Sequence, residues 1–172
     1  ALCGMTTDIT ERKIAEEMLR SNDIFIRGIL NSLSAHICVL DKNGVILRTN
    51  DAWNEFARWN SNREVSRIAV GKNYLDVCRQ SIAGGQSKAQ ISLDGIEAVL
   101  AGSTPSFSQE YACHSPDEKR WFLMRVTPLK DSKGTKGVVI SHTDISGQVR
   151  VGLALEEHVL LLNEKQKELE AL

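Results

Sequence analysis

The chain has 172 residues, of which 42% are hydrophobic and 25% charged, and its formal net charge at pH 7 is -1. These values are ordinary for a soluble globular domain, and they exclude a protein that binds nucleic acid or a membrane surface through strong positive charge. No apolar run approaches the roughly 20 residues that a membrane span needs. The four cysteines lack CxxC spacing, which argues against a zinc site or a disulfide scaffold and favours reduced thiols in a cytoplasmic protein.

The first half of the chain predicts a helix, a β-hairpin and a second helix. Apolar residues recur at helical spacing after Thr10, a fair N-cap, so we expect a helix over residues 10–32. Two short apolar runs then flank Asn43-Gly44, the strongest short-range hairpin signal. Asn50 or Asp51 is expected to cap a short helix that carries Trp53, Phe56 and Trp59.

The second half predicts two more helices, three strands and a terminal helix. Helical patterns cover residues 74–82 and 88–101, the latter with Ile91, Ile96, Val99 and Leu100 facing inward. Residues 106–114 alternate, residues 120–129 are apolar on both faces, and residues 137–146 form the last expected strand. This order predicts an α+β protein with one five-stranded antiparallel sheet. The middle helices would cover one face, and the N-terminal helix is the natural candidate to cover the other.

Four motifs in this frame resemble the PAS domain, the sensory module of bacterial signalling proteins. They are VLDKNGVILRTNDAWNEFA, GKNYLDVC, EYACHSPDEKRWFLMRVTPL and SHTDIS, and the resemblance covers residues 23–148. It implies the PAS fold with strand order 2-1-5-4-3, a pocket between the sheet and the middle helices, and a homodimer formed through flanking helices.

A repeated tetrapeptide indicates how the chain is divided. TDIT at residues 7–10 nearly matches TDIS at 143–146, and a helical pattern follows each copy. We therefore expect residues 1–10 to be the tail of a preceding PAS domain and residues 10–32 a connecting helix. The PAS domain itself would span 33–146, and residues 147–172 would form an outgoing coiled-coil helix. In this scheme Asp144, Ile145 and Ser146 transmit the signal from the last strand to that helix.

The resemblance also suggests residues that line the pocket. The expected set is Cys38, Leu40, Phe56, Tyr74, Cys78, Ile96, Tyr111, Phe122, Met124 and Ile140. An apolar molecule or an organic acid is the expected ligand, and Arg120 or Arg125 would pair with a carboxylate if either pointed inward. A closed core without any ligand, in a domain that only dimerises or spaces its neighbours, is the alternative.

Cofactor and redox chemistry find less support in the sequence. No histidine lies between His36 and His114, which removes the usual haem ligand of the family. GKNYLDVC resembles the flavin-binding motif of light-sensing PAS domains, but Tyr74 stands where their reactive cysteine would be. Non-covalent FAD stacked on Trp53, Trp59 or Trp121 stays possible, as does redox sensing by Cys78 or Cys113. We expect no metal, and no catalytic signature is present, so the chain is not expected to be an enzyme.

The terminal helix carries leucines at intervals of seven, Leu155, Leu162 and Leu169. His158 and Lys165 occupy the other core position of this heptad, so a two-stranded coiled coil formed there would be weak. We therefore expect a sensory or signal-relay domain that passes its signal to an output domain. From the habits of the family, a sensor histidine kinase or a diguanylate cyclase is the leading expectation, with adjacent PAS and output domains as partners.

Overall fold

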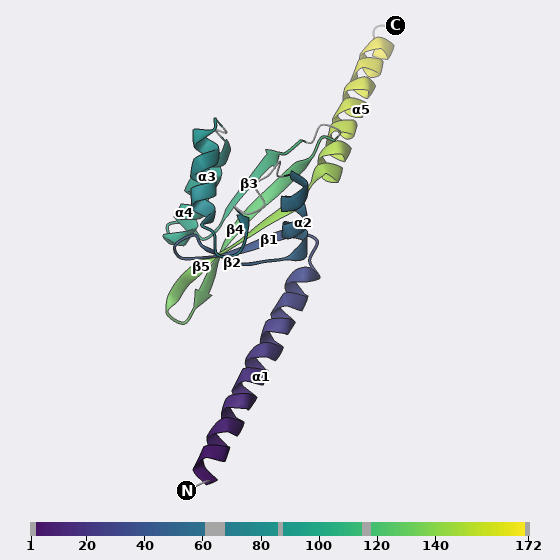
Figure 1. Cartoon of the computed structure of the whole chain (residues 1–172). Coiled ribbons are helices and arrows are strands. Elements are labelled where there is room, and N and C mark those ends of the chain that lie inside the picture. Colours follow the sequence, from purple (N-terminus) through teal and green to yellow (C-terminus); the bar gives the residue numbers. More distant parts are fainter. Residues whose placement is uncertain (1–2, 61–67, 86–87, 115–117, 171–172) are drawn as a thin grey trace.

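Figure 1 shows the computed structural model of the chain, which describes residues 3–60, 68–85, 88–114 and 118–170. The elements are α1 (Cys3–Asn31), β1 (His36–Asp41), β2 (Ile46–Thr49), α2 (Asp51–Asn60), α3 (Tyr74–Ala83), α4 (Lys88–Leu100), β3 (Phe107–Ala112), β4 (Trp121–Asp131), β5 (Gly134–Asp144) and α5 (Ser146–Glu170). The five strands form one antiparallel sheet in the order β2-β1-β5-β4-β3. Both the α+β class and the expected strand order are confirmed.

The turn between β1 and β2 forms where the Asn-Gly pair predicts it. The Oδ1 atom of Asp41 accepts hydrogen bonds from the backbone N–H groups of Asn43 and Val45, both at 2.8 Å. Gly44 has a φ of +85°, and a Cβ atom there would lie 2.5 Å from Cγ of Leu75 on α3. A side chain at this position would therefore strain the backbone and collide with a neighbouring helix.

The last strand lies in the middle of the sheet. β5 pairs with β1 along residues 137–142 and with β4 along residues 134–144. Contact at Gly137 is so close that a Cβ atom would lie 1.9 Å from the carbonyl oxygen of Leu40. Only glycine allows β1 and β5 to meet at this point.

The core lies on one face of the sheet, under α2, α3 and α4. Its buried members are Cys38, Leu40, Ile46, Trp53, Leu75, Cys78, Leu93, Ile96, Val99, Met124, Val126, Val138 and Ile140. On α4, Ile96 and Val99 are buried as expected, but the inward orientation of Ile91 is wrong. Ile91 lies on the solvent side of the helix and is 53% exposed, whereas Leu93 takes the buried position.

The two terminal helices project away from the sheet (Figure 1). The expectation that the N-terminal helix covers the second face of the sheet is wrong, because α1 extends outward and leaves Ile14, Met18 and Phe25 exposed. It also begins at Cys3 and contains residues 7–10, which the sequence placed ahead of the helix. None of the helices in the described ranges has the length and apolar character needed to cross a membrane.

Asn50 fastens the end of α1 to the body. This side chain is fully buried, and its Nδ2 atom donates to the carbonyl oxygens of Leu30, Leu33 and Ala35 at 3.1, 3.3 and 2.8 Å. Its Oδ1 atom accepts from the N–H groups that open β1 and α2, at 2.9 and 3.0 Å. One amide thus joins α1, β1 and α2. Of the two N-cap candidates for α2, Asn50 and Asp51, the structure uses Asn50.

Replacing Asn50 should destabilise the fold strongly. Asn50→Ala leaves several buried carbonyl and N–H groups without partners, so we expect a loss of about 3 kcal/mol in the free energy of unfolding, measured by urea denaturation. Asn50→Asp keeps the acceptor but points a carboxylate at carbonyl oxygens, which should raise its pKa. That variant should therefore lose stability as the pH rises from 5 to 7.

The exposed Gln90→Ala is the control for this series, and its stability should stay within about 0.5 kcal/mol of the wild type. An Asn50→Ala protein as stable as this control would show that the amide does not hold the three elements together.

Candidate functional site

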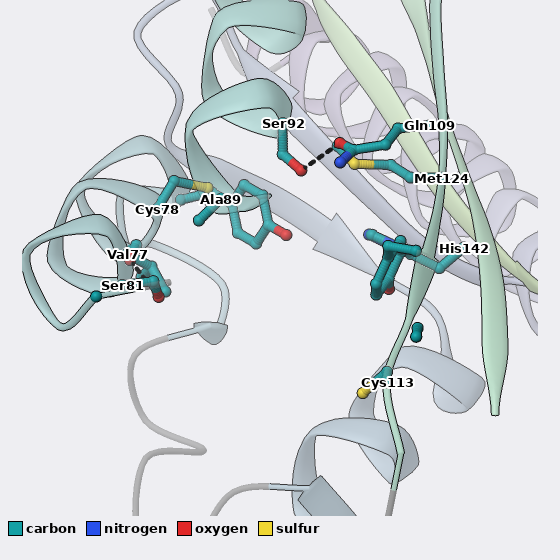
Figure 2. Close-up of a pocket in the computed structure, with 13 residues that line it drawn as sticks. Val77, Cys78, Ser81, Ala89, Ser92, Gln109, Cys113, Met124 and His142 are labelled. Atoms are coloured by element: carbon teal, nitrogen blue, oxygen red, sulfur yellow. Dashed lines mark hydrogen bonds between the residues drawn. The ribbon is translucent and has the colours of Figure 1, made fainter. Parts of the chain in front are cut away.

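A cavity of about 490 Å³ lies between α3, α4 and the strands β3, β4 and β5. It is lined by Tyr74, Val77, Cys78, Ser81, Gly85, Ala89, Ser92, Gln109, Tyr111, Ala112, Cys113, Met124 and His142. Figure 2 shows side chains from both helices and from the strands directed toward this space. Its volume lies in the range of about 300–1,000 Å³ that is typical of small-molecule sites.

The helical wall of the cavity follows from helix geometry. Asn73 caps α3 by accepting hydrogen bonds from the N–H groups of Leu75 and Asp76. Tyr74, Cys78 and Ser81 then share one side of α3, since residues four and seven positions apart lie on the same face of a helix.

The strand wall follows from the register of the sheet. Gln109 on β3 is paired with Met124 on β4, and Met124 is paired with His142 on β5. Side chains that are paired across neighbouring strands point to the same face of the sheet. These three side chains therefore form a row across the sheet, with Tyr111 next to Gln109 on that face of β3.

Two hydrogen bonds organise the polar groups of the cavity. The Tyr111 hydroxyl and Nδ1 of His142 lie 2.8 Å apart. The Ser92 hydroxyl donates to Oε1 of Gln109, also at 2.8 Å, and so links α4 to β3 (Figure 2). These two pairs hold four polar side chains in defined orientations around the space.

Burial favours the uncharged forms of four titratable side chains of this wall. Burial, together with the nearby His36, lowers the pKa of His142 to about 4. Burial also raises the pKa of the Tyr74 and Tyr111 hydroxyls, and it raises the pKa of the Cys78 thiol to about 11. Cys78 is therefore a protonated thiol at pH 7, which argues against the redox sensing that the sequence left as an alternative.

The structure brings together four of the ten side chains that the sequence assigned to the pocket. Tyr74, Cys78, Tyr111 and Met124 line the cavity. Cys38, Leu40, Ile96 and Ile140 do not line it, because α2 and α4 cover the central strands closely and place these four side chains in the solid core. Phe56 and Phe122 also lie outside it, in an aromatic cluster in which His36 stacks on Phe56 at 4.5 Å.

The most important lining residue that the sequence assignment missed is His142. It stands within the last expected strand, residues 137–146, but was not among the residues assigned to the pocket. Its position two residues after Ile140, which itself follows Val138 by two, was the available signal that all three share the inner face of β5. Gln109 was missed as a lining residue too, although its alternation with Tyr111 was plain.

The residues expected to bind an acid or a flavin lie elsewhere. Arg125 is exposed on the outer face of β4, and the guanidinium of Arg120 lies 5.9 Å from the ring centre of Phe56, outside the cavity lining. Trp53 donates its indole N–H to the carbonyl of Ile68, and neither it nor Trp121 lines the cavity. The side chain of Trp59 falls outside the described residues.

The joint between β5 and α5 lies on the same strand as His142. Asp144 accepts a hydrogen bond from the N–H of Ser146 at 2.8 Å, and the buried hydroxyl of Ser146 accepts from the N–H of Trp121 at 2.9 Å. Desolvation opposes ionisation of Asp144, but the hydrogen bonds from Ser146 and the positive charges of Arg150 and Arg120 together lower the pKa of this carboxyl. The start of α5 is thus held against the beginning of β4.

The buried neutral imidazole predicts a loss of stability in acid. The pKa of His142 is lowered from an ordinary 6.5 to about 4, so the unfolded chain takes up a proton more readily than the folded one between these values. The contribution of the neutral His142 to the free energy of unfolding is therefore full above pH 6.5. As the pH falls toward 4, the free energy of unfolding decreases by about 3 kcal/mol.

Chemical denaturation of the wild type at pH 7, 5.5 and 4.5 should show this loss. His142→Gln should remove most of the pH dependence, while the exposed His158→Gln on α5 should leave it unchanged. A pH dependence that is the same in all three proteins would contradict the assignment to His142.

Comparison with known proteins agrees with this geometry. A family model described as PAS fold matches residues 30–150. An uncharacterised 104.1 kDa protein in the hypE 3' region of Rhodobacter capsulatus is 36% identical over 124 residues. That match covers 70% of this chain but only 13% of the Rhodobacter protein.

Two solved structures share the fold at low sequence identity. The PAS domain of Bordetella pertussis BvgS is 19% identical with a TM-score of 0.53, and the match covers 80% of this chain and 98% of that one. A C-terminal domain from Streptococcus mutans is also 19% identical, with a TM-score of 0.51 and coverage of 73% and 87%. The match to the family model, which spans most of the chain, shows that this protein belongs to the PAS family.

Proposed function

We propose that this PAS domain is a sensory and signal-relay unit that binds a small molecule in the cavity and passes the event to α5. The observation that carries the proposal is the spacing of two residues on β5. His142 belongs to the cavity wall, and Asp144, two residues later, holds the first turn of α5. Residues two apart on a strand lie on the same face, so a shift of His142 acts directly on the joint.

One hydrogen bond in the cavity wall and two cross-strand pairs connect the cavity with the joint and support this route. Tyr111 is bonded to His142 and is paired across the sheet with Phe122, which is paired in turn with Asp144. A ligand that displaces the Tyr111 hydroxyl from the imidazole would shift His142, to which Tyr111 is bonded, and Phe122, with which it is paired. Asp144, Ile145 and Ser146 are therefore the residues that we assign to transmission.

The flanking helices are proposed to act as a homodimer. Leu155, Leu162 and Leu169 are 63%, 55% and 73% exposed in the single chain, and they recur every seven residues. A second copy of α5 packed against these leucines would bury them in a parallel coiled coil. His158 and Lys165 at the other core position would keep this coiled coil weak. A weak coiled coil suits a switch, because a relay needs two states that differ by only a few kcal/mol.

The larger protein is proposed to be a cytoplasmic array with an output domain, either a sensor histidine kinase or a diguanylate cyclase. Within it, residues 1–10 would end a preceding PAS domain, residues 10–32 would connect, residues 33–146 would sense, and residues 147–172 would lead outward. The Rhodobacter relative, of which the match covers 13%, leaves ample length for such neighbours.

A ligand-free dimerisation or spacer module is the second candidate. The observation that favours it is the apolar surface of both terminal helices, which would associate whether or not the cavity is filled. Ile14, Met18 and Phe25 on α1 are 54%, 69% and 66% exposed.

Native mass spectrometry of the purified chain distinguishes the two candidates. A sensor should carry or accept a bound small molecule, and filling the cavity by Ala89→Trp should abolish that bound mass. Gln90→Trp is the matched control, since the adjacent side chain is exposed and does not line the cavity. A wild type that never shows a bound mass after expression in its host would favour the spacer module.

Asp144→Ala in the full-length protein should uncouple binding from output. It removes the carboxylate that holds the start of α5 but no group of the cavity wall, so ligand affinity should change by less than about twofold. Output activity should lose its response to ligand. Thr143→Ala, at the exposed neighbouring position on the outer face, is the control and should respond normally. An unchanged response in Asp144→Ala would refute the proposed route.

A further inference from the structure

Among the described side chains that line the cavity there is no aspartate, glutamate, lysine or arginine. The lining side chains are aliphatic, aromatic, hydroxyl, carboxamide or sulfur-containing, together with one imidazole. Burial holds that imidazole, both tyrosine hydroxyls and the Cys78 thiol in their neutral forms at pH 7. The surface offered to a ligand is therefore polar in part, but it carries no formal charge on these groups.

The charged side chain that follows Cys78 on α3 is paired outside the cavity. Arg79, next to Cys78 on α3, pairs with Asp76 and with Glu97, both at 2.8 Å, on the exposed side of the helices. The side chain of Asn73 already accepts from the N–H groups at the start of α3, so this helix terminus does not offer them to an anion. An organic acid entering the cavity would lose its hydration without gaining a counter-charge from the described lining, which is strongly unfavourable.

The same wall offers hydrogen bonds that the protein itself does not use. Tyr74 lines the cavity, and its hydroxyl makes no hydrogen bond to the described part of the chain. Gln109 uses Oε1 to accept from Ser92, which leaves its Nε2 hydrogens for a ligand. His142 uses Nδ1 toward Tyr111, which leaves its second ring nitrogen. A ligand must satisfy these groups in return for the water it displaces.

We propose that the cavity selects an uncharged small molecule that carries hydroxyl or carboxamide groups on a planar ring, and that it discriminates against organic anions. The planar shape matches the aromatic side chains of Tyr74 and Tyr111 and the polarisable sulfur of Met124. This inference rests on the proposed sensory function, because it names the class of molecule that the same cavity would bind. It also replaces the organic acid that the sequence suggested.

Matched pairs of probes that differ in charge but not in shape test the proposal. Benzamide and benzoate form one pair, and nicotinamide and nicotinate form a second. Each is titrated into the ¹⁵N-labelled protein at pH 7, and the shifts of the amide signals of Tyr74, Gln109 and His142 report binding in the cavity. We expect each amide to bind at least about tenfold more tightly than its acid.

A pH series with benzoate supplies a second readout on the wild type. Between pH 7 and pH 5 the neutral fraction of a carboxylic acid with a pKa near 4 rises about tenfold for each unit. The apparent affinity for benzoate should rise accordingly, while that for benzamide stays flat, because His142 remains neutral over this range.

A variant that places a cation in the wall supplies the converse. Gln109→Lys should reverse the preference within each pair, while Gln90→Lys, on the exposed side of α4, should not. Circular dichroism establishes that both variants fold. If Gln109→Lys does not fold, the pH series on the wild type still tests the proposal.

The possible failures point to different conclusions. If the acids perturb the cavity signals as strongly as the amides at pH 7, the ligand class is wrong while the sensory function stands. If neither member of either pair perturbs the signals and Ala89→Trp has no effect on any bound mass, the sensory function fails as well.

Discussion

Backbone hydrogen bonds join β5 to β1 along one edge and to β4 along the other, so the last strand of the chain lies at the centre of the sheet. Its inner face carries Val138 and Ile140 into the core, His142 into the cavity wall and Asp144 to the start of α5. Core, cavity and outgoing joint are therefore successive positions of one strand. A slip of its register by one residue would turn all four side chains to the opposite face. The close contact at Gly137 is one reason why the register is unique.

Polarity inside this domain is arranged as neutral pairs, and charge is kept at the surface. The cavity pairs Tyr111 with His142 and Ser92 with Gln109. The ion pairs of Arg79, which follows the lining residue Cys78, are half-exposed and contribute little to stability. A neutral hydrogen bond costs less to break than a buried ion pair when a ligand arrives. Such a wall can exchange partners with a small molecule without leaving an uncompensated charge behind.

The incoming and outgoing helices are fastened in different ways. Asn50 holds the end of α1 through a fully buried amide that also accepts from N–H groups at the starts of β1 and α2. β1 is separated by two strands from β3, which carries the cavity wall residue Gln109. By contrast, α5 begins at Ser146, four residues after His142 of the cavity wall, and the side chains of Asp144 and Ser146 hold its first turn. In the proposed relay an event in the cavity would therefore reach the α5 joint first, whereas Asn50 anchors the end of α1 to the body.

Much of the fold was readable from local signals. Asn43-Gly44 predicted the hairpin, alternation predicted the late strands, and the family motifs predicted the strand order. Patterns of period 2 and 3.6 report which face of an element is buried. They do not report whether an inward side chain meets another side chain or an open space, and this is why Cys38 and Ile140 were assigned to a pocket that they do not reach. For the same reason the apolar stripe of α1 was assigned to the sheet, although a stripe does not specify its partner.

The sequence by itself determined the elements, their order and the family, because these depend on residue types at short spacing. Only the tertiary structure decided which side chains border the cavity and what charge they carry. His142 shows why. Its inward direction follows from alternation, but its neutral state follows from burial and from the nearby His36, which is far away in the chain. A pKa depends on everything that surrounds a group in three dimensions, and no local pattern records those surroundings.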